Sequence, residues 1–104
     1  MIREIIIGCV KDVVEERYGV CINRVDKKER YNVAEARGVA VLVTRILFGI
    51  KYSEIAKHLK LNKMTAIFAA DRVEERSKTD KILRKEITEI IKIVKDKTDS
   101  VLSD

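Results

Sequence analysis

Four consecutive side chains in the middle of the chain carry groups that can contact the edges of DNA bases. They are Asn62, Lys63, Met64 and Thr65. A lysine can donate to guanine acceptors, a threonine can bond a base or a phosphate, and a methionine or phenylalanine can touch a thymine methyl group. Phe68 and Arg72 would follow on the same outer face of a helix. Met64 and Phe68 are equally well explained as members of the hydrophobic core.

The spacing around these side chains predicts two short helices between residues 52 and 76. The first has one apolar stripe, made of Ile55, Ala56 and Leu59. The second has a narrow stripe of small residues, made of Ala66, Ala69, Ala70 and Val73. Two short helices with small facing residues and a connection of about 3–4 residues are typical of a helix-turn-helix. Such a motif places the first residues of its second helix against bases in the major groove.

The predicted turn consists of Lys60, Leu61 and Asn62, and capping signals lie on either side of it. Asn62 is a favourable N-cap for the second helix, and Ser53 is predicted to cap the first, because side-chain oxygens accept from free amides of the first turn. Lys60 stands where such turns often have glycine. It must therefore tolerate a positive φ, unless the turn takes another form.

Length and composition predict a single all-α domain over residues 1–104. The chain is 46% hydrophobic, has no proline and has only four glycines, which favours helices over a sandwich or barrel with many tight turns. The formal net charge is +5, and residues 51–72 contain five Lys or Arg against two acidic residues. This basic balance is compatible with nucleic acid or an acidic membrane surface as a partner.

Three longer helices are predicted around the helix-turn-helix. Their segments are 2–17, 33–48 and 80–95. The first carries an apolar stripe of Ile2, Ile5, Ile6, Cys9, Val10 and Val13. The second is apolar around most of its circumference, so it should be the central helix of the domain. Residues 96–104 are polar and are expected to fray. The whole chain is then a compact domain of five or six helices.

Capping residues mark the ends of these longer helices. Asn32 and Glu35 form a capping arrangement at the start of the central helix. Thr79 or Asp80 can cap the last helix. Two glycines are natural stops after the first and the central helix, Gly19 and Gly49.

The connection between residues 20 and 30 has two interpretations. Its apolar residues, Val20, Ile22 and Val25, could cover the core as part of a short helix that starts near Asn23. The remainder is charged and includes Lys27, Lys28 and Arg30. It could be a solvated connection, or a basic loop that contacts a phosphate backbone or reaches into a minor groove.

The sequence lacks the residues that metal binding and catalysis require. Cys9, Cys21 and His58 have unrelated spacings that do not resemble a zinc site, so neither a metal nor another cofactor is expected. The chain has no glycine-rich phosphate loop and no nucleophile elbow, so we expect neither an enzyme nor a small-molecule substrate. No apolar run is long enough to span a bilayer and no secretory signal is present, which predicts a cytoplasmic protein with reduced thiols.

From residue 25 to residue 73 the order of these features resembles the C-terminal DNA-binding domain of DnaA-type chromosomal replication initiators. The matching segments are the basic loop Lys27-Lys28-Glu29-Arg30, the helix opening Val33-Ala34-Glu35-Ala36-Arg37, and Glu54-Ile55 at the start of the first motif helix. Arg45 stands where the family has a basic residue that contacts phosphate. The family's signature stretch, of the form D-H-T-T-V-x-H-A, corresponds to residues 62–69, where Thr65 and Ala69 are kept.

The resemblance implies a DnaA C-terminal or Trp-repressor-like fold that binds double-stranded DNA of specific sequence, as in origin binding during replication initiation. The predicted DNA-contacting residues are Lys27, Lys28, Arg30, Arg37, Arg45, Lys57, Lys60, Asn62, Lys63, Met64, Thr65, Phe68 and Arg72. Two alternatives stay open: a transcription regulator with the same motif, and a helical protein-interaction module. In the second, the isoleucine-rich first and last helices would bind a protein partner or pack as a homodimer.

Overall fold

The computed structural model describes residues 2–22 and 30–102, and within these ranges it consists of five α-helices without a strand. In chain order they are α1 (Ile2–Tyr18), α2 (Arg30–Phe48), α3 (Tyr52–Leu59), α4 (Lys63–Ser77) and α5 (Lys81–Leu102). The predicted all-α fold is therefore confirmed. In this part of the chain no helix is both long enough and apolar enough to cross a lipid bilayer.

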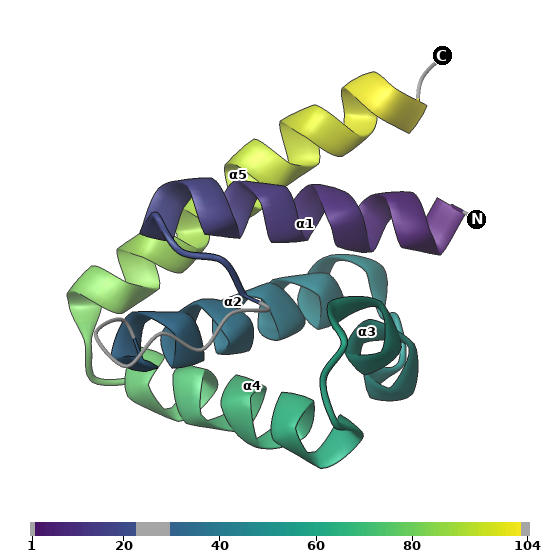
Figure 1. The fold of residues 1–104 in the computed structure, drawn as a ribbon. Helices are drawn as coiled ribbons and strands as arrows, with labels where there is room; N and C mark the ends of the chain where they lie inside the picture. The colour runs from purple at the N-terminus through teal and green to yellow at the C-terminus, as the bar shows by residue number, and fades with distance from the viewer. Residues whose placement is uncertain (1, 23–29, 103–104) are drawn as a thin grey trace.

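Helix α2 is the central element, as its nearly continuous apolar surface predicts. It contacts each of the other four helices. Helices α1 and α5 lie on one side of α2, α4 lies along the opposite side, and α3 closes its C-terminal end (Figure 1). The buried side chains of α2 cover most of its circumference: Val33, Ala36, Val39, Ala40, Val41, Leu42, Val43 and Thr44. The hydroxyl of Thr44 is satisfied inside the core, because it donates to the carbonyl oxygen of Ala40 at 2.7 Å.

The contact between α2 and α4 is very close because small residues face each other. An ideal Cβ atom added to Gly38 would lie 2.4 Å from the carbonyl oxygen of Ala69 and 2.4 Å from Cγ2 of Val73. Both neighbours belong to the predicted stripe of small residues on α4. The stripe therefore has its partner at Gly38 of α2, where only a glycine allows the two backbones to approach so closely.

The predicted stops and the cap of the last helix are confirmed. Gly19 and Gly49 have φ of +66° and +63°. The amide of Gly19 donates to the backbone carbonyl of Glu15 at 2.8 Å, and the amide of Gly49 donates to the backbone carbonyl of Arg45 at 3.0 Å. These bonds satisfy carbonyls at the ends of α1 and α2. At the start of α5, Oδ1 of Asp80 accepts from the amides of two residues in the first turn, each at 3.0 Å.

Three predictions about helix limits and faces were wrong. Helix α2 begins at Arg30, so Asn32 lies inside it rather than capping it. Helix α5 continues to Leu102 instead of fraying after residue 95, because Thr98 is buried and its hydroxyl donates to the Val94 carbonyl at 2.8 Å. In α1 the buried face is rotated from the predicted stripe. Its members are Ile6, Ile7, Val10, Val13 and Val14, while Ile2 and Ile5 are 61% and 51% exposed.

The segment after α1 covers the core as expected, since Val20 and Ile22 are both buried. The short helix predicted near Asn23, together with Val25 and the loop residues Lys27 and Lys28, falls outside the described residues. Arg30 was predicted as a loop residue, but it is the first residue of α2.

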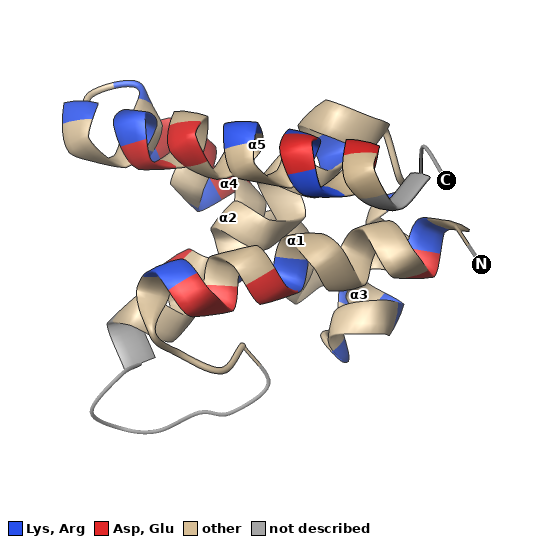
Figure 2. Ribbon diagram, turned by 90° about the horizontal axis from the view of Figure 1, so that it is seen from above, with Lys and Arg blue, Asp and Glu red and all other residues tan. Residues whose placement is uncertain are grey.

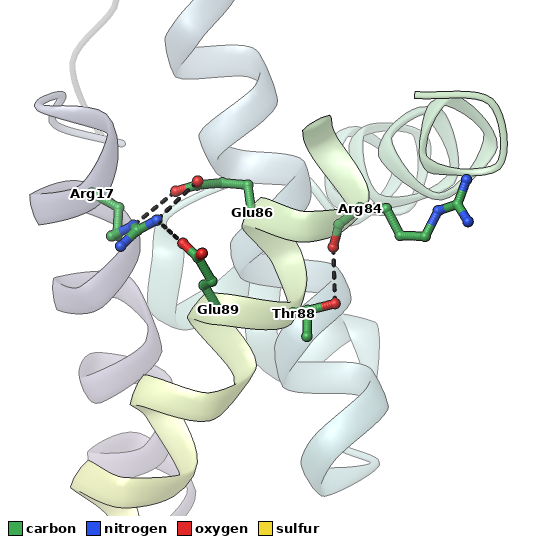
Figure 3. A network of polar contacts seen from close by, with 5 residues as sticks. All are labelled: Arg17, Arg84, Glu86, Thr88 and Glu89. Atoms are coloured by element: carbon green, nitrogen blue, oxygen red, sulfur yellow. Dashed lines mark hydrogen bonds and ion pairs between the residues drawn. The ribbon is translucent and has the colours of Figure 1, made fainter. Parts of the chain in front are cut away.

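Arg17 joins the end of α1 to α5 through a group of charged hydrogen bonds (Figure 3). Its guanidinium donates to the two carboxylate oxygens of Glu86 at 2.7 and 2.9 Å, and also to Glu89. A bidentate pair of this kind has a defined geometry as well as a charge. The hydrogen bonds from Arg17 lower the pKa of the Glu86 carboxyl.

Candidate nucleic-acid interface

The turn between α3 and α4 uses Lys60 in a left-handed conformation, with φ of 57° and ψ of 44°. The amide of Leu61 donates to the carbonyl of Ala56 at 2.8 Å, and the amide of Lys60 donates to the carbonyl of Lys57 at 3.3 Å. This pair of bonds is the Schellman arrangement that ends a helix. Of the two forms considered for the turn, the structure therefore has the one in which lysine takes a positive φ.

Asn62 caps α4 as predicted. Its backbone is extended, with φ of −68° and ψ of 142°, and its Oδ1 accepts from the amide of Met64 at 2.9 Å. The corresponding prediction for α3 was wrong, because Ser53 lies within that helix. Lys51 occupies the N-cap position of α3 and makes no side-chain capping bond.

The outer face of α4 carries side chains that the core does not use. Lys63, Thr65 and Arg72 are exposed. Met64 is 50% exposed and Phe68 is 62% exposed, so the alternative in which these two belong to the core is wrong. The opposite face of α4 is buried through Ala66, Ala70 and Val73. Packing thus holds α4 by its small residues and leaves its larger polar and apolar side chains outward.

Three of these outward residues and one residue of α2 meet at a cavity of about 300 Å³ between the two helices. Thr65, Phe68 and Arg72 line it from α4, and Arg37 lines it from α2. The remaining lining residues are Ala34, Glu35, Ala69, Val73 and Arg76. Four of the predicted DNA-contacting residues, Arg37, Thr65, Phe68 and Arg72, therefore line the same cavity.

Arg76 is a lining residue that the sequence analysis missed. Nη1 of Arg76 lies 2.9 Å from a carboxylate oxygen of Glu35, which ties α4 to α2. The helical spacing of Arg76 relative to two predicted contact residues could have indicated this position. Thr65, Arg72 and Arg76 follow each other at i, i+7 and i+11, which is one side of a helix.

Arg37 and Arg45 each have a partner in the backbone. Nε of Arg37 donates to the carbonyl of Ile22 at 2.8 Å, which holds the segment after α1 against α2. Nη1 of Arg45 donates to the carbonyl of Ile50 at 3.1 Å, and its guanidinium lies 4.7 Å from the ring centre of Tyr52. Arg45 is not among the cavity residues. It fastens the α2–α3 connection, a positioning role that the sequence did not indicate.

Exposed lysines lie along α3 and the α3–α4 turn. Lys51 precedes α3, Lys57 lies on its last turn, Lys60 is the first residue of the connection and Lys63 is the first residue of α4. Among the residues that the structure describes, none of these four lysines has an ion-pair partner. The turn and the start of α4 therefore present uncompensated positive charge. Lys27 and Lys28 cannot be placed relative to it, since they lie outside the described residues.

The structure thus defines a class: an all-α domain with two helices joined by a three-residue turn, and with exposed lysines at the turn and at the start of the second helix. No protein-family model matches the chain, and no solved structure matches it significantly. The chain is similar to the chromosomal replication initiator protein DnaA of Mycoplasma capricolum subsp. capricolum, with 31% identity over 80 residues. The similar part covers 75% of this chain but only 18% of that DnaA. The likeness is therefore to one domain-sized part of a much longer protein.

Proposed function

We propose that this chain is a double-stranded DNA-binding module of the replication-initiator kind, which inserts α4 into the major groove and recognises a specific sequence. The observation that carries the proposal is the outer face of α4, where Lys63, Met64, Thr65 and Phe68 are exposed directly after an N-cap. The similarity to DnaA, a chromosomal replication initiator protein, supports the same function.

The start of α4 suits contact with a polyanion and with base edges. The first amides of a helix and its dipole favour a phosphate oxygen. Lys63 can donate to guanine O6 or N7, and the exposed Met64 and Phe68 offer apolar surface for thymine methyl groups. Because α4 is held from behind by its close contact with α2 at Gly38, the helix that carries these side chains has a fixed orientation in the domain.

The lysines around the turn would supply affinity without sequence information. Lys51, Lys57 and Lys60 are exposed on the α3 side of α4 and would neutralise phosphates beside the groove. Arg72 would do so further along α4. The basic loop that contains Lys27 and Lys28 is proposed as a second contact in the adjacent minor groove, as the resemblance to replication initiators implies.

Two single substitutions test the assignment of roles on this surface. Lys63→Ala should relax sequence preference, with a loss of about 1–3 kcal/mol confined to sites that carry the preferred base. Lys57→Ala should weaken all duplexes similarly and reduce the salt slope by about one. Fluorescence anisotropy over a salt series would measure both, on a duplex selected from a random pool and on a scrambled duplex. Equal losses from both variants on both duplexes would contradict the roles assigned, and no binding of any duplex at low salt would contradict DNA binding itself.

The exposed isoleucines of α1 favour protein interaction as a second candidate function. Ile2 and Ile5 are 61% and 51% exposed on the first two turns of α1. Among the isoleucines of α5, Ile87 and Ile90 are buried in the core, whereas Ile82 at the start of the helix is 83% exposed. Sedimentation velocity of the native chain and of Ile2→Ser/Ile5→Ser would test the homodimer. A concentration-dependent dimer that the double variant loses is the result expected from this candidate.

A further inference from the structure

The outer face of α5 carries a row of basic side chains on a different side of the molecule from α4. Its six residues are Lys81, Arg84, Lys85, Thr88, Lys92 and Lys95, all of them exposed. Their spacing places them along one side of the helix. From the first to the last, this α5 stripe extends for about 21 Å at 1.5 Å per residue. Figure 2 shows Lys and Arg recurring along α5.

The acidic residues of the same segment do not neutralise the α5 stripe. Between residues 81 and 95 the only acidic residues are Glu86 and Glu89. Both face α1, where they bind the guanidinium of Arg17 (Figure 3). Within the described part of the chain, none of the four lysines of the stripe forms an ion pair. The charge of these four lysines is therefore free to bind an external polyanion, whereas the Arg84 guanidinium donates to the carbonyls of Ser77 and Lys78.

The position of the stripe separates it from the proposed reading surface. Helix α2 lies between α4 on one side and α1 with α5 on the other, and α4 meets α5 only near the short connection from residue 78 to residue 80 (Figure 1). A duplex seated on the outer face of α4 leaves most of the α5 stripe uncovered. A second polyanion can bind there at the same time.

The chemistry of the stripe favours nucleic acid over a lipid surface. Helices that lie on membranes insert an apolar face between lipids. In α5 that face is already buried in the core through Leu83, Ile87, Ile90 and Val94. The stripe itself offers cations, because its one hydroxyl, that of Thr88, already donates to the Arg84 carbonyl at 2.9 Å. The exposed apolar residue near it is Ile82, 83% exposed at the start of the helix. Lysine and arginine cations are groups that contact phosphate oxygens of DNA.

We propose that the α5 stripe binds the phosphate backbone of a second DNA duplex, so that a single chain bridges two duplexes. This inference rests on the proposed function, because α4 must hold the first duplex. Binding at α5 would be independent of sequence, because contacts from lysines to phosphates carry no sequence information. It would weaken steeply with salt, because each phosphate contact releases counterions.

A capture assay with two duplexes tests the bridge. A biotinylated duplex carrying the selected site is fixed to beads, and the retention of a free fluorescent duplex of scrambled sequence is measured against protein concentration and salt. The key variant is Lys85→Gln/Lys92→Gln. Lys11→Gln/Lys97→Gln is the matched control, because it removes the same charge at positions outside the stripe, and Lys85→Arg/Lys92→Arg restores the charge.

The native chain, the matched control and the arginine variant should retain the second duplex. The glutamine variant should retain at least about tenfold less, and its retention should depend on salt with a slope smaller by about two, one for each lost phosphate contact. Its affinity for the single selected duplex should stay close to native.

Each other outcome has a separate meaning. If the native chain binds the selected duplex but retains no second duplex, the bridge is wrong and the proposed function stands. If the glutamine variant bridges as well as the native chain, the stripe is not the contact. If the native chain binds no duplex at all, the proposed function fails. Stripe-dependent binding to phosphatidylserine vesicles that exceeds duplex binding at the same salt would overturn the choice of partner.

Discussion

At the scale of single residues, the polar side chains whose partners lie nearby in the sequence were the most predictable. Asn62 was identified as a helix cap and Asp80 was one of two candidates for the next, because a cap needs only amides two or three residues further on. The same rule failed for Ser53, because α3 begins at Tyr52 and its N-cap position is Lys51. The role of Arg45 was also missed, since the Tyr52 ring and the Ile50 carbonyl come next to it only through the turn after α2.

The cap at the start of α4 leads to a prediction about stability. Asn62→Ala removes the acceptor of the Met64 amide at 2.9 Å, so it should lower the free energy of unfolding by about 1 kcal/mol. Asn62→Asp should retain most of it, because a carboxylate also accepts this bond. Ser53→Ala is the control, since Ser53 makes no capping bond and should change stability by less than about 0.5 kcal/mol. Urea unfolding followed by circular dichroism would measure all three, and equal losses from Asn62→Ala and Ser53→Ala would contradict the assignment.

At the scale of the helices, periodicity predicted where they lie but not where they touch. The small residues of α4 indicated a close contact, yet nothing in the spacing of α2 singled out Gly38 as the partner. The buried face of α1 was misjudged for a related reason. Its isoleucines and valines occur on several sides, and only the positions of α2 and α5 decide that Ile7 and Val14 are buried while Ile2 and Ile5 are not.

The crossing of α2 and α4 gives a prediction with an internal control. Gly38→Ala places a methyl group 2.4 Å from the Ala69 carbonyl oxygen. The resulting strain, about 1–3 kcal/mol, should exceed the helix-propensity gain of roughly 0.5–1 kcal/mol. The variant should therefore be less stable, and α4 should be displaced with its DNA-facing side chains. Gly8→Ala should instead be stabilising by that propensity gain, because a Cβ atom at Gly8 meets nothing within 4 Å. Chemical denaturation of the two variants would distinguish them, and a stabilised Gly38→Ala would show that the helices separate at little cost.

At the scale of the whole molecule, composition was sufficient to predict the all-α class, and the apolar circumference of residues 33–48 was sufficient to predict a central helix. It was not sufficient to predict which surfaces would be free. The relative placement of α4 and α5 on different sides of α2 depends on the full set of helix contacts. In sequence the lysines of α5 look like an ordinary solvated face alternating with Glu86 and Glu89. Only the fold shows that both carboxylates turn to Arg17 and leave the cations unbalanced.

The bond between Arg17 and Glu86 should make the attachment of α1 to α5 sensitive to acid. Because the folded pKa of Glu86 is lowered, this bond adds stability that is fully present above the ordinary pKa of a glutamate, about 4.3, and is lost as pH falls through the folded value. Urea unfolding between pH 6 and pH 3 should therefore show a smaller acid loss for Arg17→Gln than for the native chain. Lys57→Gln removes the same charge at a lysine that forms no ion pair among the described residues, so it should keep the native pH dependence. Identical acid loss in the native chain and Arg17→Gln would mean that the α1–α5 bond contributes nothing to folding, whereas a convergence of their stabilities near pH 3 would show that protonation of Glu86 releases it.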